Sequence, residues 1–209
     1  EVFYRKVEIR PLSEVPREYL AEVPAGAVGE EGFTPLFGKD AADGWAQCGP
    51  GSFVLEDGIA TGRAGMGLWW CTRKQYGDFV LRGEFLQEEE LADSGVFLRF
   101  PDPRGDPWNA VKQGHEVEIG DSRPARSKDG TGSIYPFHGP VEVPVRPIGQ
   151  WNEYEIACEG QHYSVRLNGR LVNTWTDPAR RARKGFVGLQ NYNDGKTVRH
   201  RNLRVKELP

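Results

Sequence analysis

The chain has few cysteines and no long apolar run, and each shortage removes a class of protein. Cys48, Cys71 and Cys158 are widely spaced and odd in number. They give neither a disulfide framework nor the ligand spacing of a zinc site, and we interpret them as small core residues. No stretch approaches the roughly 18 consecutive apolar residues of a membrane-spanning helix. We therefore expect no membrane partner.

An excess of charge of either sign is missing as well. The 27 basic and 30 acidic residues leave a net charge of −3, which does not favour a nucleic-acid surface or a basic membrane-binding patch. What the chain has in abundance is glycine, with 26 residues, proline, with 15, and aromatic side chains, at 11%. Many turns and many aromatics in a chain long enough to bury a sizeable core predict an all-β protein built as a two-sheet antiparallel sandwich.

Short segments of alternating polar and apolar residues support this fold class. Only residues 14–20 and 177–183 read as helical, and the Gly- and Pro-rich stretches 101–113 and 122–147 read as loops. The predicted strands span residues 2–10, 52–55, 59–62, 68–72, 78–87, 94–100, 116–119, 152–159, 162–167, 170–175, 185–190 and 198–206.

The two ends of the chain resemble each other. Residues 2–12 align without gaps to residues 198–208, with Arg5 matching Arg201 and Leu12 matching Leu208. We therefore interpret residues 1–12 as the last strand of a preceding copy of the module, 13–31 as a linker and 32–209 as the domain itself. A tandem neighbour in the same polypeptide is then a partner. The alternative is an ordinary amphipathic N-terminal strand.

The most informative segment is the acidic strand at 114–121, GHEVEIGD. Side chains alternate along a strand, so Glu116 and Glu118 share one face while Val117 and Ile119 point into the core. Two carboxylates this close repel each other unless the protein uses them. The uses are acid–base chemistry on a sugar, metal binding or pairing with arginines on a solvated face.

Several segments, in order, resemble the 3-keto-disaccharide hydrolase domain family. No single piece is specific, but together they cover about residues 32–208. The matching pieces are GFTPLFGKD at 32–40, YGDFVL at 76–81, DSGVFLR at 93–99, GHEVEI at 114–119, TGSIY at 131–135, WN at 151–152, LNG at 167–169, GFVGLQ at 185–190 and RNL at 201–203. The sequence departs from the family pattern at Asp93, where Asn is usual, at Glu118, where Gln is usual, and at His200, where Phe is common.

The resemblance implies a concanavalin A-like jelly roll with a carbohydrate site on its concave sheet, in an extracellular or periplasmic protein. It also implies cleavage of glycosides oxidised at C3. A C3 ketone makes H2 acidic, so the C1–O bond can break by elimination followed by hydration. That chemistry needs a base, an acid for the leaving oxygen, and an electrophile at the C3 carbonyl, a role a divalent metal ion could fill.

Candidate catalytic residues follow from both arguments. Glu116 and Glu118 are the carboxylates, and Arg99 could orient Glu116 or bind a carbonyl oxygen, although a structural ion pair is an equal alternative. His138 is preferred to His115 as a base, because His115 should point away from Glu116.

Candidate binding residues surround them. Trp70 and Tyr135 could pack against sugar faces, and Gln190 and Asn191 could bind hydroxyl groups. Asp121 could ligate a cation with Glu118 or cap a turn. Metal ligands are otherwise not assigned. The sequence thus predicts an enzyme that cleaves a 3-keto-glycoside. The alternative is a non-catalytic carbohydrate-binding module of a larger protein.

Overall fold

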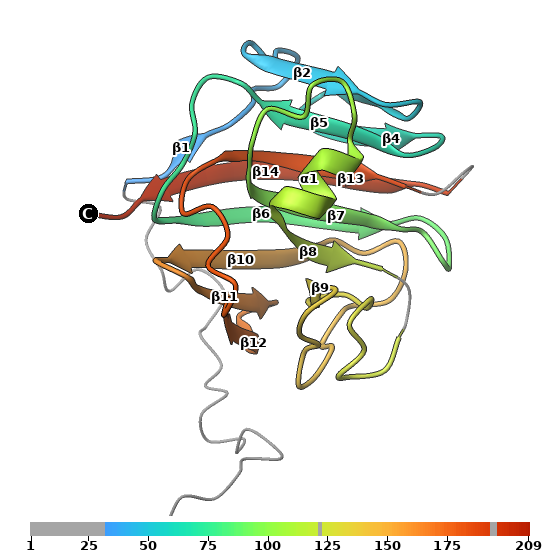
Figure 1. The fold of residues 1–209 in the computed structure, drawn as a ribbon. Helices are drawn as coiled ribbons and strands as arrows, with labels where there is room; N and C mark the ends of the chain where they lie inside the picture. The colour runs from blue at the N-terminus through green and yellow to red at the C-terminus, as the bar shows by residue number, and fades with distance from the viewer. Residues whose placement is uncertain (1–31, 121–122, 193–195) are drawn as a thin grey trace, which may run out of the picture.

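The computed structural model describes residues 32–120, 123–192 and 196–209, and these form two antiparallel β-sheets stacked face to face (Figure 1). The larger sheet has eight strands in the order β12-β11-β10-β6-β14-β4-β3, with β1 pairing to β14. The smaller sheet has six strands in the order β2-β5-β13-β7-β8-β9. The predicted two-sheet antiparallel sandwich is confirmed.

The strands predicted within the described residues differ from the observed bounds by at most one residue, whereas the short strands at 34–35, 45–48 and 134–135 were not predicted. The larger sheet contains β1 (Thr34–Pro35), β3 (Ser52–Glu56), β4 (Ile59–Arg63), β6 (Phe79–Gln87), β10 (Asn152–Glu159), β11 (His162–Leu167), β12 (Arg170–Thr176) and β14 (Val198–Glu207). The smaller sheet contains β2 (Trp45–Cys48), β5 (Gly67–Cys71), β7 (Ser94–Phe100), β8 (His115–Ile119), β9 (Ile134–Tyr135) and β13 (Phe186–Asn191).

The main core lies between the sheets and takes alternate side chains from each strand. Val117 and Ile119 of β8 are 2% exposed and belong to it, as the alternation predicted. Cys71 and Cys158 are also buried there as free thiols, whereas Cys48 is half-buried and packs elsewhere. The interpretation of the cysteines as core residues therefore holds fully for two of the three.

A second, smaller apolar cluster lies on the outer face of the six-stranded sheet. It contains Phe97 and Phe100 of β7, Leu68 of β5, and Ala110 of the short helix α1 (Trp108–Gln113). In Figure 1 this helix lies across the front of the sheet, over β7 and β13. It covers one part of the outer face, and the pocket described below occupies the part beside it.

Three assignments of secondary structure were wrong. The stretch 122–147, expected to be a loop, contains β9. The stretch 101–113, expected to be a loop, ends in α1. Residues 177–183, expected to be helical, form a turn and irregular backbone instead. The Asp177 carboxylate accepts hydrogen bonds from the backbone N–H groups of Ala179 and Arg181, which stabilises the turn in place of a helix. The predicted strand 2–10, helix 14–20 and linker 13–31 lie outside the described residues. Within the described part of the chain, no helix is long and apolar enough to cross a bilayer.

Candidate functional site

The acidic strand β8 points both of its glutamates into one pocket on the outer face of the six-stranded sheet. The pocket has a volume of about 220 Å³. Glu116, Glu118 and Gln190 of β13 line it together with residues from α1 and from the segment 123–135. The prediction that the two carboxylates share a face is therefore confirmed.

Gly95 of β7 leaves the space that the Glu116 side chain occupies. A Cβ atom at this position would lie 2.1 Å from Oε1 of Glu116 and 2.9 Å from its Cδ. Gly95 pairs with Glu118 on one side and with Gln190 on the other, so the glutamate side chain lies over the glycine backbone between the two neighbouring strands. Only a glycine leaves room for this arrangement.

Two buried oxygen atoms of the pocket have no hydrogen-bond partner among the described residues. They are Oε1 of Glu116 and Oε1 of Gln190, whose side chains belong to residues that are 2% and 6% exposed. A buried polar atom without a partner costs about 1–3 kcal/mol, so its presence in a pocket points to a ligand or a catalytic role.

The carboxyl groups of the pocket resist ionisation. Burial raises the pKa of Glu116 well above its usual value, and the nearby charge of Asp93 adds to the effect. Burial also raises the pKa of Glu118, which is further raised by Glu116 and by a hydrogen bond to Asp93. We infer that Glu118 holds a proton and donates it to Asp93. Such perturbed carboxyl groups in a pocket are typical of acid–base catalysts.

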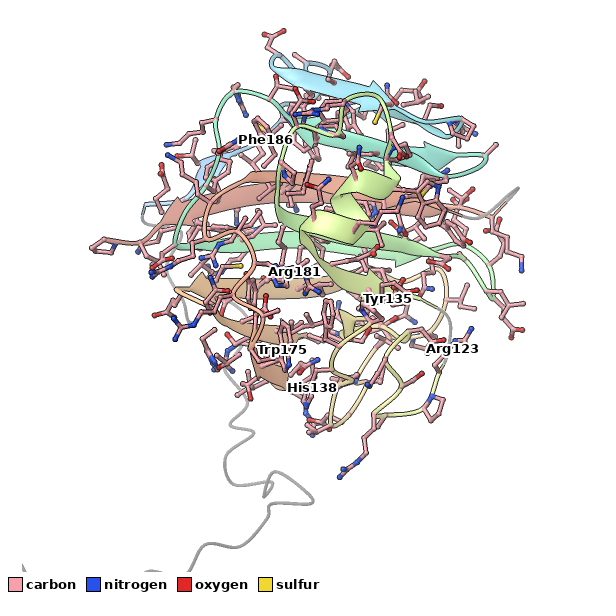
Figure 2. The ribbon with its side chains drawn as sticks, in the orientation of Figure 1. Arg123, Tyr135, His138, Trp175, Arg181 and Phe186 are labelled. Atoms are coloured by element: carbon pink, nitrogen blue, oxygen red, sulfur yellow. The ribbon has the colours of Figure 1, made fainter. Side chains whose placement is uncertain are left out.

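The rim of the pocket is polar on one side. Arg123 Nη1 lies 3.0 Å from Asp129 Oδ2, and both side chains are about half exposed. Tyr135 of β9, which pairs with Glu116 across the strands, also lines the pocket. Burial raises the pKa of Tyr135, and Glu116 and Glu118 raise it further. Figure 2 shows Arg123 and Tyr135 at the same end of the molecule, where the segment 123–147 lies against β8.

Arg99 does not reach the pocket, so its predicted role beside Glu116 was wrong. Arg99 has a φ of 51°, and the β7–β13 register shifts next to it, so its side chain turns inward. It is fully buried. Its Nη2 donates hydrogen bonds to Oδ1 of Asp78 at 2.9 Å and to the carbonyl oxygen of Cys158 at 3.0 Å. This is the structural ion pair given above as the alternative role of Arg99.

Three other predicted residues lie outside the residues that line the pocket. His138 is exposed, and its Nδ1 lies 2.7 Å from Asn173 Oδ1. Trp70 packs against the apolar cluster beneath α1. Asn191 faces the other way from Gln190 and donates to the carbonyl oxygens of Arg63 and Gly65. Asp121 lies outside the described residues, so its role stays a prediction.

His115 confirms the parity argument. It faces the interior, where its Nε2 lies 3.0 Å from Asp177 Oδ2 and its ring packs 4.3 Å from that of Tyr163. Burial lowers the pKa of His115 to about 4. The histidine is therefore neutral at physiological pH and belongs to the packing between the sheets.

Part of the pocket was not predicted from the sequence. Asp93 was noted only as a departure from the family pattern, and Trp108, Tyr192, Arg123 and Asp129 were not considered. The last four gave a signal only through their position, since they lie in the two Gly- and Pro-rich stretches flanking β8 or directly after β13.

A divalent metal ion stays a prediction, because Asp121, which was expected to ligate it with Glu118, lies outside the described residues. Among residues 32–120, 123–192 and 196–209, no group of three or more His, Cys, Asp or Glu side chains is arranged to hold one. The Glu118 carboxyl is instead hydrogen-bonded to Asp93, which uses oxygens that a metal would need. The chemistry proposed below uses only the side chains of the described residues.

Solved structures support the fold. A candidate glycosyl hydrolase from Parabacteroides distasonis ATCC 8503 is 24% identical and aligns over 84% of this chain and 99% of its own, with a TM-score of 0.70. A second one from the same organism is 19% identical over 86% and 95% of the two chains, with a TM-score of 0.69. The carbohydrate-binding module CBM66 from Bacillus subtilis is 16% identical over 78% and 96%, with a TM-score of 0.59.

At these identities the structural likeness shows the fold alone. No protein of curated function matches the sequence significantly. The family comparison goes further, because residues 32–206 match the 3-keto-alpha-glucoside-1,2-lyase-like domain, which is the family that the sequence motifs resembled. The chain therefore belongs to the 3-keto-alpha-glucoside-1,2-lyase-like domain family, a carbohydrate-related family of glycosyl hydrolase-like β-sandwiches.

Proposed function

We propose that this domain cleaves glycosides whose sugar ring is oxidised at C3, using the buried carboxyl groups of β8. The observation that carries the proposal is the pair Glu116 and Glu118, both buried, both with a raised pKa, and both facing one pocket. Burying two carboxyl groups in one pocket is costly, which acid–base catalysis explains better than the binding of a neutral sugar does.

The reaction divides between the two glutamates. Glu116 acts as the base in its ionised form, and its raised pKa makes that form a stronger base. It takes the proton from C2, and the electron pair of that C–H bond forms the C1=C2 double bond as the C1–O bond breaks. Glu118, which holds a proton beside Asp93, supplies it to the leaving oxygen. Water then adds across the double bond to give the free 3-keto sugar. No oxidant or reductant is consumed.

Two neutral donors are available for the C3 carbonyl oxygen, on which negative charge develops when H2 leaves. They are the hydroxyl group of Tyr135 and the side-chain amide of Gln190, both in the pocket lining. Fixed donors aimed at a developing oxyanion are among the largest contributions to enzymatic rate. The raised pKa of Tyr135 keeps its hydroxyl group protonated and able to donate.

A carbohydrate-binding role is the second candidate. The mouth of the pocket exposes Trp108 and Tyr192, and exposed aromatic rings are the usual sugar contacts of binding modules. The fold is also shared with CBM66. On this alternative the carboxyl groups would accept hydrogen bonds from sugar hydroxyl groups and no bond would break.

The test compares a 3-keto-glucoside with its unoxidised parent. The purified protein is incubated with each compound, release of the leaving alcohol is followed by NMR, and binding is measured by calorimetry. We expect cleavage of the oxidised compound only. Binding of either sugar without turnover would overturn the proposal and establish the binding module instead. Cleavage of both at similar rates would contradict the elimination, because the parent has no acidic H2.

A further inference from the structure

A second pocket lies beside β14 and shares no described lining residue with the acidic pocket around Glu116. We call it the β14 pocket; residues 35–39, the turn at 57–58, Glu84 and residues 202–204 line it. Glu84 belongs to the outer face of the eight-stranded sheet, because its strand neighbour Phe85 is in the core. The volume is about 690 Å³, against about 220 Å³ for the acidic pocket. Small-molecule sites typically have about 300–1,000 Å³, so the β14 pocket is large enough for a short oligosaccharide.

A bulge in β14 forms one side of the β14 pocket. Where β14 passes Gly83 of β6 its register shifts, and Asn202 and Leu203 both stand opposite this one glycine. Asn202 has a φ of 53°, in the left-handed region that few residues other than glycine adopt. Its Nδ2 donates a hydrogen bond to Oε1 of Glu84 at 2.6 Å, which stabilises the bulge. Bulges of this kind often redirect side chains beside functional sites, and here the bulge brings the amide of Asn202 to the pocket lining.

Backbone hydrogen bonds fix the remaining walls of the β14 pocket. The N–H of Leu36 donates to the carbonyl oxygen of Leu203 at 2.9 Å, which ties the first wall to the bulge. The N–H of Gly58 donates to the carbonyl oxygen of Lys39, which ties the first wall to the turn between β3 and β4. Phe37 lines the pocket and also packs against the main core. A pocket whose walls are already fixed loses little conformational entropy when a ligand binds.

The charges of the β14 pocket balance among the described residues that line it. Lys39 Nζ lies 3.0 Å from Asp57 Oδ1, and both side chains are largely exposed. The Glu84 carboxylate accepts a hydrogen bond from Arg201 Nε at 2.7 Å, and Arg204 is the second cation of the lining. An anionic ligand would meet the two carboxylates, and a cationic ligand would meet the two cations. Hydroxyl groups both donate and accept hydrogen bonds, so a neutral ligand with many hydroxyl groups matches this mixture.

The apolar part of the lining narrows the ligand class further. Pro35, Phe37 and Leu203 lie among the charged groups, and a sugar ring has C–H faces that pack on such surfaces as well as hydroxyl groups at its edge. We propose that the β14 pocket is a second binding site, and that its ligand is a neutral oligosaccharide that is not oxidised. The two pockets belong to the outer faces of opposite sheets, so a glycan bound here leaves the acidic pocket open. This site does not depend on the proposed function.

The experiment first screens the wild-type protein on an array of unoxidised oligosaccharides, some neutral and some containing uronic acids. We expect neutral oligosaccharides to bind. Calorimetry then gives Kd of the best neutral ligand for two variants of the lining. Lys39→Ala should raise Kd about tenfold, because it removes a charged hydrogen-bond donor, and Asn202→Gly about fivefold, because it removes a neutral amide. Glycine adopts a positive φ without steric cost, so Asn202→Gly leaves the backbone of the bulge unstrained.

The matched control is Lys74→Ala, because Lys74 also forms an exposed ion pair, with Glu207 at 2.7 Å, and does not line the β14 pocket. It should leave Kd unchanged, and so should Glu116→Gln, which alters the acidic pocket. Thermal unfolding of each variant shows that the fold is intact.

Three results would overturn the second site. They are binding of no oligosaccharide on the array, binding of uronic acid oligosaccharides alone, and a Kd that Glu116→Gln raises while Lys39→Ala does not. The last result would place the glycan in the acidic pocket. Because the readout is binding, a protein that cleaves no 3-keto-glycoside still tests this site, and failure of the proposed function is told apart from failure of the inference.

Discussion

Substituting Gly95 by alanine should displace the carboxyl group of Glu116. The added methyl group would lie 2.1 Å from Oε1 of Glu116, whereas real contacts of a Cβ atom are essentially never shorter than 3.0 Å. The carboxyl group must therefore move by about 1 Å. A displacement of about 1 Å of a reacting group can cost about 100-fold in rate, so we expect kcat/KM for a 3-keto-glycoside to fall by about that factor.

The stability of the same variant should change much less. The atom that meets the new methyl group is the far end of a flexible side chain, so the cost belongs at the lower end of the roughly 1–3 kcal/mol typical of overpacking. Rates are measured with a 3-keto-glycoside, and stability by thermal unfolding. Gly77→Ala is the matched control, because its Cβ atom would meet nothing closer than 4.0 Å. A Gly95→Ala protein with wild-type kcat/KM would refute the claim that the space over Gly95 positions Glu116 for the reaction.

Three further substitutions probe the charges. Because the pKa of Glu118 is raised, the folded state binds more protons than the unfolded state, and the stabilising contribution of Glu118 at acid pH is lost as the pH rises through the raised pKa. Glu118→Gln should therefore gain stability relative to wild type as the pH rises. Urea unfolding at several pH values measures this, and an unchanged pH dependence would contradict it. Burial lowers the pKa of His200 to about 3, so the contribution of this neutral histidine to stability is present above about pH 6.5 and is lost as the pH falls below it. His200→Phe should therefore lose less stability than wild type between pH 6.5 and 4. An equally steep loss in the variant would count against this role of His200. Arg99→Met should lower the free energy of unfolding by about 3 kcal/mol, which is at the low end for a buried ion pair because the Asp78 side chain is 34% exposed. The kcat should stay nearly unchanged below the unfolding temperature. A selective loss of kcat would show that Arg99 takes part in the reaction.

The fold and the direction of the acidic side chains could be predicted from the sequence because they depend on alternation alone. Glu116 and Val117 differ only in strand parity, and β8 is regular, so one enters the pocket and the other the core. The same rule failed for Arg99, because a positive φ at that residue breaks the alternation. No glycine or other residue type in the segment indicates such a conformation.

The partners of Glu116 could not be predicted, because they come from segments far apart in the chain. Asp93, Trp108 and Tyr192 meet at the pocket only because β7, α1 and β13 are neighbours in space. The two departures from the family pattern at Asp93 and Glu118 gave one usable signal. Both replace an amide by an acid, and in the structure these two side chains hydrogen-bond to each other.

The most direct test of the account is the turnover of Glu116→Gln on a 3-keto-glycoside. The substitution keeps the shape of the side chain and removes its ability to accept the proton from C2. We expect turnover to be lost while the thermal unfolding midpoint stays at or above that of wild type, since a buried carboxyl group with a raised pKa is replaced by a neutral group. Glu159→Gln, at an exposed strand end, should retain full turnover. A Glu116→Gln protein that cleaves at the wild-type rate would contradict the account.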